Sequence, residues 1–291
     1  HFLVGSIALG SSAEAAALKG LLVARNRIDL ATIGLGKLVR KAVSDIAKSH
    51  HGGNTHLGVC LLFVPLAAAA AKSHIETGQI SPHVLRNNVK KIMESTTPED
   101  AVAVYEAIAL ASSPHEMGKV DGDRAPDLYD KQAKRKILAD GVTLFDVMKQ
   151  ASSYDSIARE LVTGMEISFE VGYKKMMETF NTSRDINVAT VHTFLQILAV
   201  VPDTFIARKI GLRFDSDIRR AVDLGRKETM WISGTAEQVL KLGGLTTKEG
   251  EAALWEFDGK LQSLGKDYSP GTTADLTATA LMIALLCGLK F

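Results

Sequence analysis

The sequence has only two cysteines among its 291 residues, Cys60 and Cys287, and both lie in apolar runs. Two thiols cannot build the disulfide framework of a small secreted domain, so that class is excluded and a reducing compartment is indicated. An excess of charge is also missing, since 34 basic and 33 acidic residues leave a net charge of +1. General nucleic-acid and membrane-surface binders depend on a basic excess. We therefore expect a cytoplasmic protein with neither a nucleic acid nor a membrane as its partner.

Zinc-binding patterns and full-length membrane spans are missing as well. The eight histidines form no HExxH motif and the sequence has no CxxC pair, so a zinc site is not expected. The longest apolar runs, 57–71 and 276–289, are shorter than the roughly 20 residues that a membrane-spanning helix needs, and Pro65 interrupts the first. We interpret both runs as central helices of a buried core.

Alternating strand patterns are absent, and almost every periodic segment has helical spacing, so the predicted class is all-α. With 46% hydrophobic residues, one multi-helix domain over residues 1–291 is expected to bury its central helices. Ser81-Pro82 and Thr97-Pro98 place a cap before a proline at the first helical position, and residues 246–249 resemble a capping box. The least periodic interval, 112–136, is predicted to be a surface excursion. The eleven predicted helices run near 2–20, 34–49, 55–74, 82–94, 98–112, 143–150, 153–180, 186–200, 215–242, 247–264 and 273–289.

A turn followed by hydroxyls and a carboxylate stands near the C-terminus, where residues 270–276 read PGTTADL. Pro270 and Gly271 favour a tight turn, Thr272 or Thr273 could cap the following helix, and Asp275 would then lie in its first turn. Free N–H groups and the positive end of the helix dipole meet there, which suits phosphate or a magnesium ion that carries phosphate. A well-capped helix is the simpler interpretation.

A second stretch of this kind occurs early, where residues 51–58 read HGGNTHLG. Gly52 and Gly53 would let the backbone approach a ligand, Asn54 or Thr55 could cap, and His56 would lie in the first helical turn. The Lys-Ser/Thr pair of a Walker loop is missing. On its own, a Gly-Gly turn remains a weak signal.

Two more stretches pair carboxylates with cations. Asp155 and Arg159 are four residues apart, so they could pair with each other or hold one ligand, although a structural salt bridge would suffice. Asp203 precedes Arg208 and Lys209, where a capping aspartate and a solvated basic pair would be the simpler interpretation.

Together these stretches resemble one family, the triphosphoribosyl-dephospho-CoA synthases that make the prosthetic-group precursor of citrate lyase and malonate decarboxylase. Residues 53–58 are similar to its GNTHxG segment and 270–276 to its PGTTADL segment. Residues 154–159 and 202–209 resemble its DxIAR and PDTxIARK segments, and residues 2–10 its early helix. Five matches in the same order along the chain make the resemblance specific.

The departures from the family concern its N-terminus and two motif positions. The Lys-Pro-Gly-Asn-Val-like segment that usually comes before the early helix is missing from this sequence. Leu57 and Ser269 stand where bacterial members of citrate and malonate metabolism typically have Lys and Asn. These two positions leave the acceptor substrate open.

The resemblance implies an ATP-dependent transferase that uses Mg²⁺ as Mg-ATP. It would move the 5-triphosphoribosyl group of ATP to the 2′-hydroxyl of 3′-dephospho-CoA and release adenine. Asp155 and Asp203 are then candidates for general base or metal ligand, His56 for the group that protonates or orients adenine, and Asp275 for the magnesium ligand. The implied substrate-binding residues are Gly52, Gly53, Asn54, Thr55, Arg159, Arg208, Lys209, Gly271, Thr272 and Thr273.

Two alternatives remain open at the level of the sequence. One is the same triphosphoribosyl or glycosyl transfer to a different acceptor, for example in a one-carbon or pterin-cofactor pathway. The other is a non-catalytic helical nucleotide-binding protein, which would bind ATP without releasing adenine. A homodimer is one candidate assembly.

Overall fold

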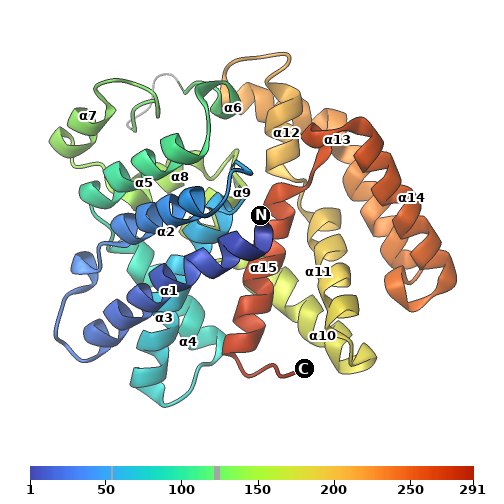
Figure 1. Cartoon of the computed structure of the whole chain (residues 1–291), viewed down its shortest axis with the longest axis horizontal. Helices are drawn as coiled ribbons and strands as arrows, with labels where there is room; N and C mark the ends of the chain where they lie inside the picture. The colour runs from blue at the N-terminus through green and yellow to red at the C-terminus, as the bar shows by residue number, and fades with distance from the viewer. Residues whose placement is uncertain (54, 121–124) are drawn as a thin grey trace. The chain divides into compact units, whose positions relative to one another are not determined.

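The structure is a computed structural model of the chain, and it describes residues 1–53, 55–120 and 125–291. Over these residues it contains helices, turns and no β-strand, so the predicted all-α class is confirmed (Figure 1). The chain contacts divide into two compact units. Unit 1 comprises His1–Ser153 with Ile157–Met165, and unit 2 comprises Tyr154–Ser156 with Glu166–Phe291. Each unit is described by itself, and the single domain over 1–291 stays a prediction.

Unit 1 is built around helix α3, whose apolar run is buried on most of its surface. Helix α1 packs along α3, and α2 packs against α1 and α5. Asp100 joins two of these helices, because its carboxylate accepts hydrogen bonds from the Thr97 N–H at the start of α5 and from the Gly36 N–H of α2. The elements of unit 1 are α1 (Phe2–Ala24), η1 (Leu30–Thr32), α2 (Leu35–Ser49), α3 (Leu57–Thr77), α4 (Pro82–Glu94), α5 (Pro98–Ala111), α6 (Pro114–Met117), α7 (Ala133–Ala139), α8 (Leu144–Ala151) and most of α9 (Ser156–Thr163).

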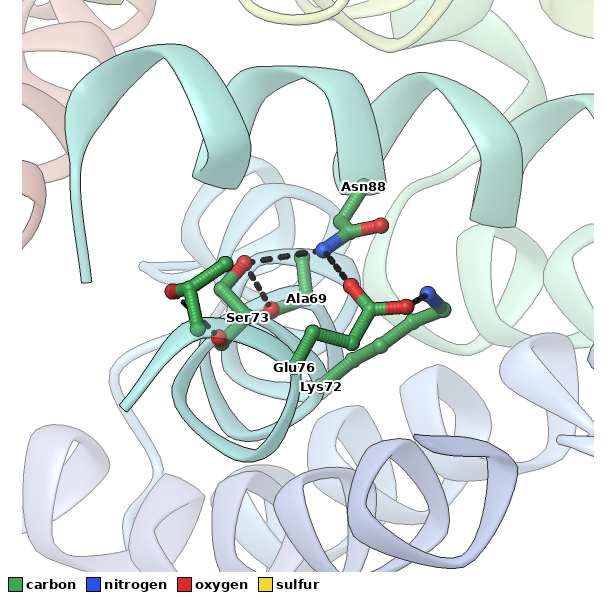
Figure 2. A network of polar contacts seen from close by, with 6 residues as sticks. Ala69, Lys72, Ser73, Glu76 and Asn88 are labelled. Carbon is green, nitrogen blue, oxygen red and sulfur yellow. Dashed lines mark hydrogen bonds and ion pairs between the residues drawn. The ribbon is translucent and has the colours of Figure 1, made fainter. Parts of the chain in front are cut away.

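A polar network fastens the end of α3 to α4 (Figure 2). The buried amide of Asn88 donates to the Ser73 hydroxyl at 3.0 Å and to Glu76 Oε2 at 2.9 Å. Glu76 also pairs with the ammonium of Lys72 one turn earlier, which is itself buried. Ser73 donates to the carbonyl of Ala69 at 2.7 Å. A buried ammonium is unfavourable unless an opposite charge lies beside it. Glu76 is therefore needed to keep the Lys72 side chain buried.

Unit 2 has its main apolar core between α11, α12, α13 and α14. Leu195, Ile206 and Ile232 lie in that core, and Phe257 meets the Trp231 ring edge-on. Helix α15 packs against the π-helix η2 and against α11. The elements of unit 2 are η2 (Ser168–Tyr173), α10 (Lys174–Ser183), α11 (Ile186–Val200), α12 (Thr204–Gly211), α13 (Ile218–Lys241), η3 (Gly244–Thr246), α14 (Lys248–Leu264), η4 (Lys266–Tyr268) and α15 (Gly271–Leu286).

Two glycines let α12 and α13 approach within backbone contact. A Cβ added at Gly211 would lie 1.7 Å from the carbonyl oxygen of Ala221, and one added at Gly225 would lie 1.8 Å from that of Ala207. Neither distance leaves room for a side chain. The close crossing fixes the position of α12, the short helix that carries Arg208 and Lys209.

The predicted helices were confirmed except in three places. The helix expected over 153–180 is broken, because Met165 adopts φ 58° after Gly164 at φ 68°, and the chain resumes as η2 and α10. Helices α6 and α7 fall in or beside the interval predicted to be irregular, and α12 was not predicted. At eight residues or fewer, these helices are too short to display a clear period.

The helix-start signals were correct for α4 and α5 and partly wrong for α14. Ser81 and Thr97 cap their helices through the backbone N–H groups of Val84 and Asp100, with a proline at the first helical position. The predicted capping box at 246–249 does not form. Thr247 does cap α14, but the third helical residue is Gly250, which has no side chain to complete the box.

Within the described part of the chain, two helices, α1 and α3, are long and apolar enough to cross a membrane. Helices α11 and α12 would be a third span if that pair, bent by 50°, were counted as one. The apolar window of α3 is 67% buried inside the protein, which agrees with its interpretation as a core helix. The window of α1 is only 22% buried. The run 276–289 extends past α15, and Cys287 lies half-buried just after that helix. That no membrane is a partner stays a prediction.

Candidate active site

In unit 2 the starts of two helices are connected through Asp203, which caps α12. Its Oδ1 accepts hydrogen bonds from the backbone N–H groups of Phe205 at 2.9 Å and Ile206 at 3.0 Å. Its Oδ2 accepts from the backbone N–H and the hydroxyl of Thr273 in α15, both at 2.8 Å. One carboxylate thus fastens the start of α12 to the start of α15.

The neighbouring residue, Thr204, adds the start of α9 to this arrangement. Its buried hydroxyl accepts a hydrogen bond from the backbone N–H of Ser156 at 3.1 Å and lies 3.4 Å from the Thr272 hydroxyl. Residues of the motifs at 202–209 and 270–276, together with Ser156 of the motif at 154–159, therefore meet around Asp203 and Thr204 within unit 2. Thr204 was not among the predicted site residues, although its place directly after the capping aspartate was a signal for it.

Asp203 is placed to hold structure together rather than to exchange protons. The residue is only 5% exposed. Burial raises the pKa of its carboxyl, although the bonds from Thr273, Ile206 and Phe205 oppose that shift. A carboxylate offers about four lone-pair positions, and four hydrogen bonds fill those of Asp203. No lone pair is then left to accept a proton from a substrate.

Asp155, unlike Asp203, is accessible to solvent, and it lies directly before α9. Its side chain is 28% exposed, and its Oδ2 lies 3.8 Å from Nη1 of Arg208, whose side chain is 14% exposed. The Nε atom of Arg208 is buried and has no hydrogen-bond partner among the described residues. The structure thus brings together two predicted site residues, a carboxylate and a guanidinium. The predicted pairing of Asp155 with Arg159 stays a prediction.

One aromatic ring, that of Phe205, lies near the cations of α12 and near the start of α15. Lys209 Nζ lies 4.3 Å and Arg208 Cζ 5.3 Å from the centroid of the Phe205 ring, distances at which cation–π attraction operates. A Cβ added at Gly271 would lie 3.1 Å from the same ring, so the glycine allows α15 to begin against it. Asp267 Oδ1 lies 3.9 Å from Lys209 Nζ. Phe205 is a second site residue that the sequence prediction missed.

The start of α15 differs from the expected one. The helix begins at Gly271, two residues before the predicted 273, with Pro270 at the cap position and no side-chain cap from the described residues. Thr272 and Thr273 are therefore inside the helix, where Thr273 binds Asp203 instead of capping. Asp275 is the fifth helical residue and not in the first turn, so that prediction was wrong.

The motif at 51–58 lies in unit 1, directly before α3. Gly53 adopts φ 74°, a conformation that favours glycine, and a Cβ added there would meet no described atom within 4 Å. Its predicted role, to let the backbone approach a ligand, stays a prediction. The helix begins at Leu57, so His56 is at the cap position and not in the first turn, and Thr55 does not cap α3. Asn54 lies outside the described residues.

His56 is held at both ring nitrogens by hydroxyl groups. Its Nδ1 lies 2.7 Å from the Thr55 hydroxyl and its Nε2 lies 3.2 Å from the Ser6 hydroxyl. Burial lowers the pKa of His56, and His50 nearby lowers it further. A neutral ring held on both sides is suited to positioning rather than to free proton exchange.

The described residues contain no group of three or more His, Cys, Asp or Glu side chains that could hold a metal ion. Magnesium bound with a nucleotide does not require such a group, because it usually takes one or two protein carboxylates, several waters and phosphate oxygens. The carboxylate of Asp275, half-buried near the start of α15, is a ligand of the kind that Mg²⁺ takes in that arrangement.

Comparison with known proteins agrees with the motifs. A family model described as ATP:dephospho-CoA triphosphoribosyl transferase matches residues 1–290. A protein from Archaeoglobus fulgidus, whose crystal structure is described provisionally as that of a triphosphoribosyl-dephospho-CoA synthase, is similar in fold. It has 26% sequence identity and a TM-score of 0.64, over 96% of this chain and 99% of that chain. No curated protein matches this chain. Because the model covers almost every residue, the chain belongs to the ATP:dephospho-CoA triphosphoribosyl transferase family.

Proposed function

We propose that this protein transfers the 5-triphosphoribosyl group of ATP to the 2′-hydroxyl of 3′-dephospho-CoA and releases adenine. The bond between C1′ and the purine nitrogen of ATP breaks, and its electron pair leaves with adenine. A bond from C1′ to the acceptor oxygen forms, the hydroxyl proton passes to a base on the protein, and the leaving adenine takes up one proton on a ring nitrogen. Single displacement of this kind inverts the configuration at C1′.

One observation supports this proposal more than the others, namely the cluster in unit 2 where Asp155 and Arg208 lie beside the joined starts of α12 and α15. It combines an accessible carboxylate with two cations. Displacement at a sugar carbon that carries a triphosphate needs this combination, because the phosphates require positive charge and the acceptor hydroxyl requires a base.

In this proposal Asp155 takes the proton of the acceptor hydroxyl. It is the accessible one of the two candidate aspartates, since Asp203 is buried and both of its carboxylate oxygens already accept hydrogen bonds. Arg208, 3.8 Å away, balances its charge and orients it. Asp203 is then a positioning residue that holds the two helix starts, and no longer our candidate for the base.

The triphosphate is assigned to Arg208 and Lys209, since the N–H and hydroxyl of Thr273 at the start of α15 are already bound to Asp203. Arg208 brings a buried donor without a partner among the described residues, and Lys209, over the Phe205 ring and 3.9 Å from Asp267 Oδ1, brings a second positive charge. Magnesium, when bound, would neutralise the phosphate oxygens, and Asp275 would be its protein ligand.

The test of this proposal is a product assay. The protein is incubated with ATP, Mg²⁺ and dephospho-CoA, free adenine is measured by chromatography, and the coupled product is identified by mass. Asp155→Asn is expected to reduce transfer by about 10²–10⁴, the usual contribution of a general base, while ATP binding persists. Asp185→Asn, which changes an exposed aspartate that caps α11, is the matched control.

The assay can contradict each part separately. Absence of adenine release with dephospho-CoA would refute the proposed reaction. Full activity of Asp155→Asn would show that this aspartate only forms an ion pair with Arg208. Loss of Mg²⁺-dependent ATP binding in Asp155→Asn would instead identify it as the metal ligand.

A further inference from the structure

Unit 2 carries a third cation, Arg213, in line with the two cations of α12. Phe205, Lys209 and Arg213 follow one another at intervals of four residues, the spacing that places side chains on one side of a helix. Helix α12 ends at Gly211, so Arg213 lies just beyond its last turn. Asp267, in the short helix η4, connects the two cations on this side. Its Oδ1 lies 3.9 Å from Lys209 Nζ, and its Oδ2 accepts a hydrogen bond from Arg213 Nη2.

The contacts give the cation row of Arg208, Lys209 and Arg213 an order that leads away from Asp155. Arg208 is the cation beside Asp155, at 3.8 Å, and it lies over the same aromatic ring as Lys209. Lys209 in turn shares the carboxylate of Asp267 with Arg213. The row therefore begins beside the candidate base and ends at Arg213.

A structural role explains part of this arrangement. Basic side chains in the last turn of a helix balance the negative end of its dipole, and the pair of Arg213 with Asp267 ties η4 to the end of α12. Among the residues that the structure describes, however, the cation row pairs with two carboxylates, those of Asp155 and Asp267, which leaves one positive charge over. The side chains of Arg213 and Asp267 are 51% and 40% exposed, and an exposed ion pair contributes little to stability. A phosphate oxygen can therefore replace the Asp267 carboxylate at low cost.

We propose that Arg213 recognises the terminal phosphate of the nucleotide, so that the protein prefers a triphosphate to a diphosphate. This inference rests on the proposed function, in which Asp155 lies beside the hydroxyl that attacks C1′, while the triphosphate leaves the same ribose at C5′ and extends away from that point. Arg208 and Lys209 then bind the phosphates nearer to the ribose, and Arg213, at the far end of the row, binds the last one. Its guanidinium can offer two N–H groups to one phosphate. Asp267 holds Arg213 in place until the nucleotide displaces it.

The test compares the binding of ATP and ADP, each with Mg²⁺, by calorimetry, which does not depend on turnover. Arg213→Met removes the charge from a long side chain, whereas Arg213→Lys keeps a charge. The matched control is Arg220→Met, because Arg220 is another exposed arginine of unit 2 that pairs with an aspartate, Asp215. Melting temperatures verify that each variant is folded.

We expect the wild type and Arg220→Met to bind ATP more tightly than ADP by the same ratio. In Arg213→Met this ratio should fall about ten-fold, the loss expected for one hydrogen bond to a charged group, because ATP binding weakens and ADP binding does not change. Arg213→Lys should keep part of the ratio. Asp267→Asn breaks the same ion pair but removes the carboxylate that competes with phosphate for Arg213, so it should bind ATP more tightly than the wild type does.

A purely structural ion pair gives different results. An unchanged ratio in Arg213→Met, an equal loss of ATP and ADP affinity in that variant, or weaker ATP binding by Asp267→Asn would overturn the inference. A wild type that binds neither nucleotide, or binds both equally, would overturn it as well. The expected binding ratios in a protein that releases no adenine with dephospho-CoA would refute only the proposed function.

Discussion

The carboxylate of Asp203 provides the sharpest test of how the site in unit 2 is held together. In Asp203→Asn the amide oxygen can still cap α12, since Asn and Asp are about equally good N-caps. The amide NH₂ must then face Thr273, whose backbone N–H is a donor as well. Two donors cannot bond, so a buried N–H loses its acceptor.

The expected loss of stability follows from that single bond. A hydrogen bond to a charged group contributes about 1.5–3 kcal/mol, and Thr273 is too buried for water to replace the lost acceptor. The Thr273 hydroxyl can turn to accept from the amide, so we count only the backbone bond. A loss of ~2 kcal/mol corresponds to a fall in Tm of about 4–8 °C for a protein of this size.

Both tryptophans of the sequence, Trp231 and Trp255, lie in unit 2, so tryptophan fluorescence reports the unfolding of this unit. Asp185→Asn is the control, because Asp185 caps α11 through two backbone N–H groups in an exposed position, and we expect a change within about 0.5 kcal/mol. Equal stability of the two variants would refute the argument, because it would mean that the bond between Asp203 and Thr273 contributes nothing.

Two further predictions concern packing and pH. Gly225→Ala is expected to destabilise unit 2, because its Cβ would lie 1.8 Å from the Ala207 carbonyl oxygen. The control is Gly234→Ala on the same helix, whose Cβ meets no described atom within 4 Å and which should stabilise the protein by about 0.5–1 kcal/mol. Equal melting temperatures of the two variants would contradict the close crossing of α12 and α13. In unit 1, burial of Glu76 opposes ionisation, but the bonds from Lys72 and Asn88 outweigh it and hold its pKa below the ordinary 4.5. Its folded carboxyl therefore binds fewer protons than the unfolded one, so this contribution to stability is present above about pH 4.5 and is lost as the pH falls through the folded pKa. Glu76→Gln should remove that part of the acid dependence. At neutral pH it should lower the free energy of unfolding by less than the ~3–5 kcal/mol expected when a fully buried pair is broken, because solvent reaches Glu76. An acid unfolding curve equal to that of the wild type would contradict the assignment.

The long helices could be predicted from the sequence because their signals are local. The bounds of α4 and α11 follow from a cap, a proline or an aspartate, and a run with helical period, all within about 15 residues. The motifs could be located for the same reason, since each helix start carries its turn and cap residues in one short stretch. The family also followed from these stretches alone.

What only the tertiary structure decided involves residues far apart in the chain. Helix α12 has eight residues, too few to show a period, and it depends on Gly211 and Gly225 for its contact with α13. The sequence left both Asp155 and Asp203 as candidates for the base and favoured Asp155 only because Arg159 follows it by four residues. They differ only through partners elsewhere in the chain: Thr273, 70 residues from Asp203, fills its lone pairs, whereas Asp155 stays accessible beside Arg208. Local pattern determines which helices form, but burial and hydrogen bonding between distant segments determine which carboxylate can meet a substrate.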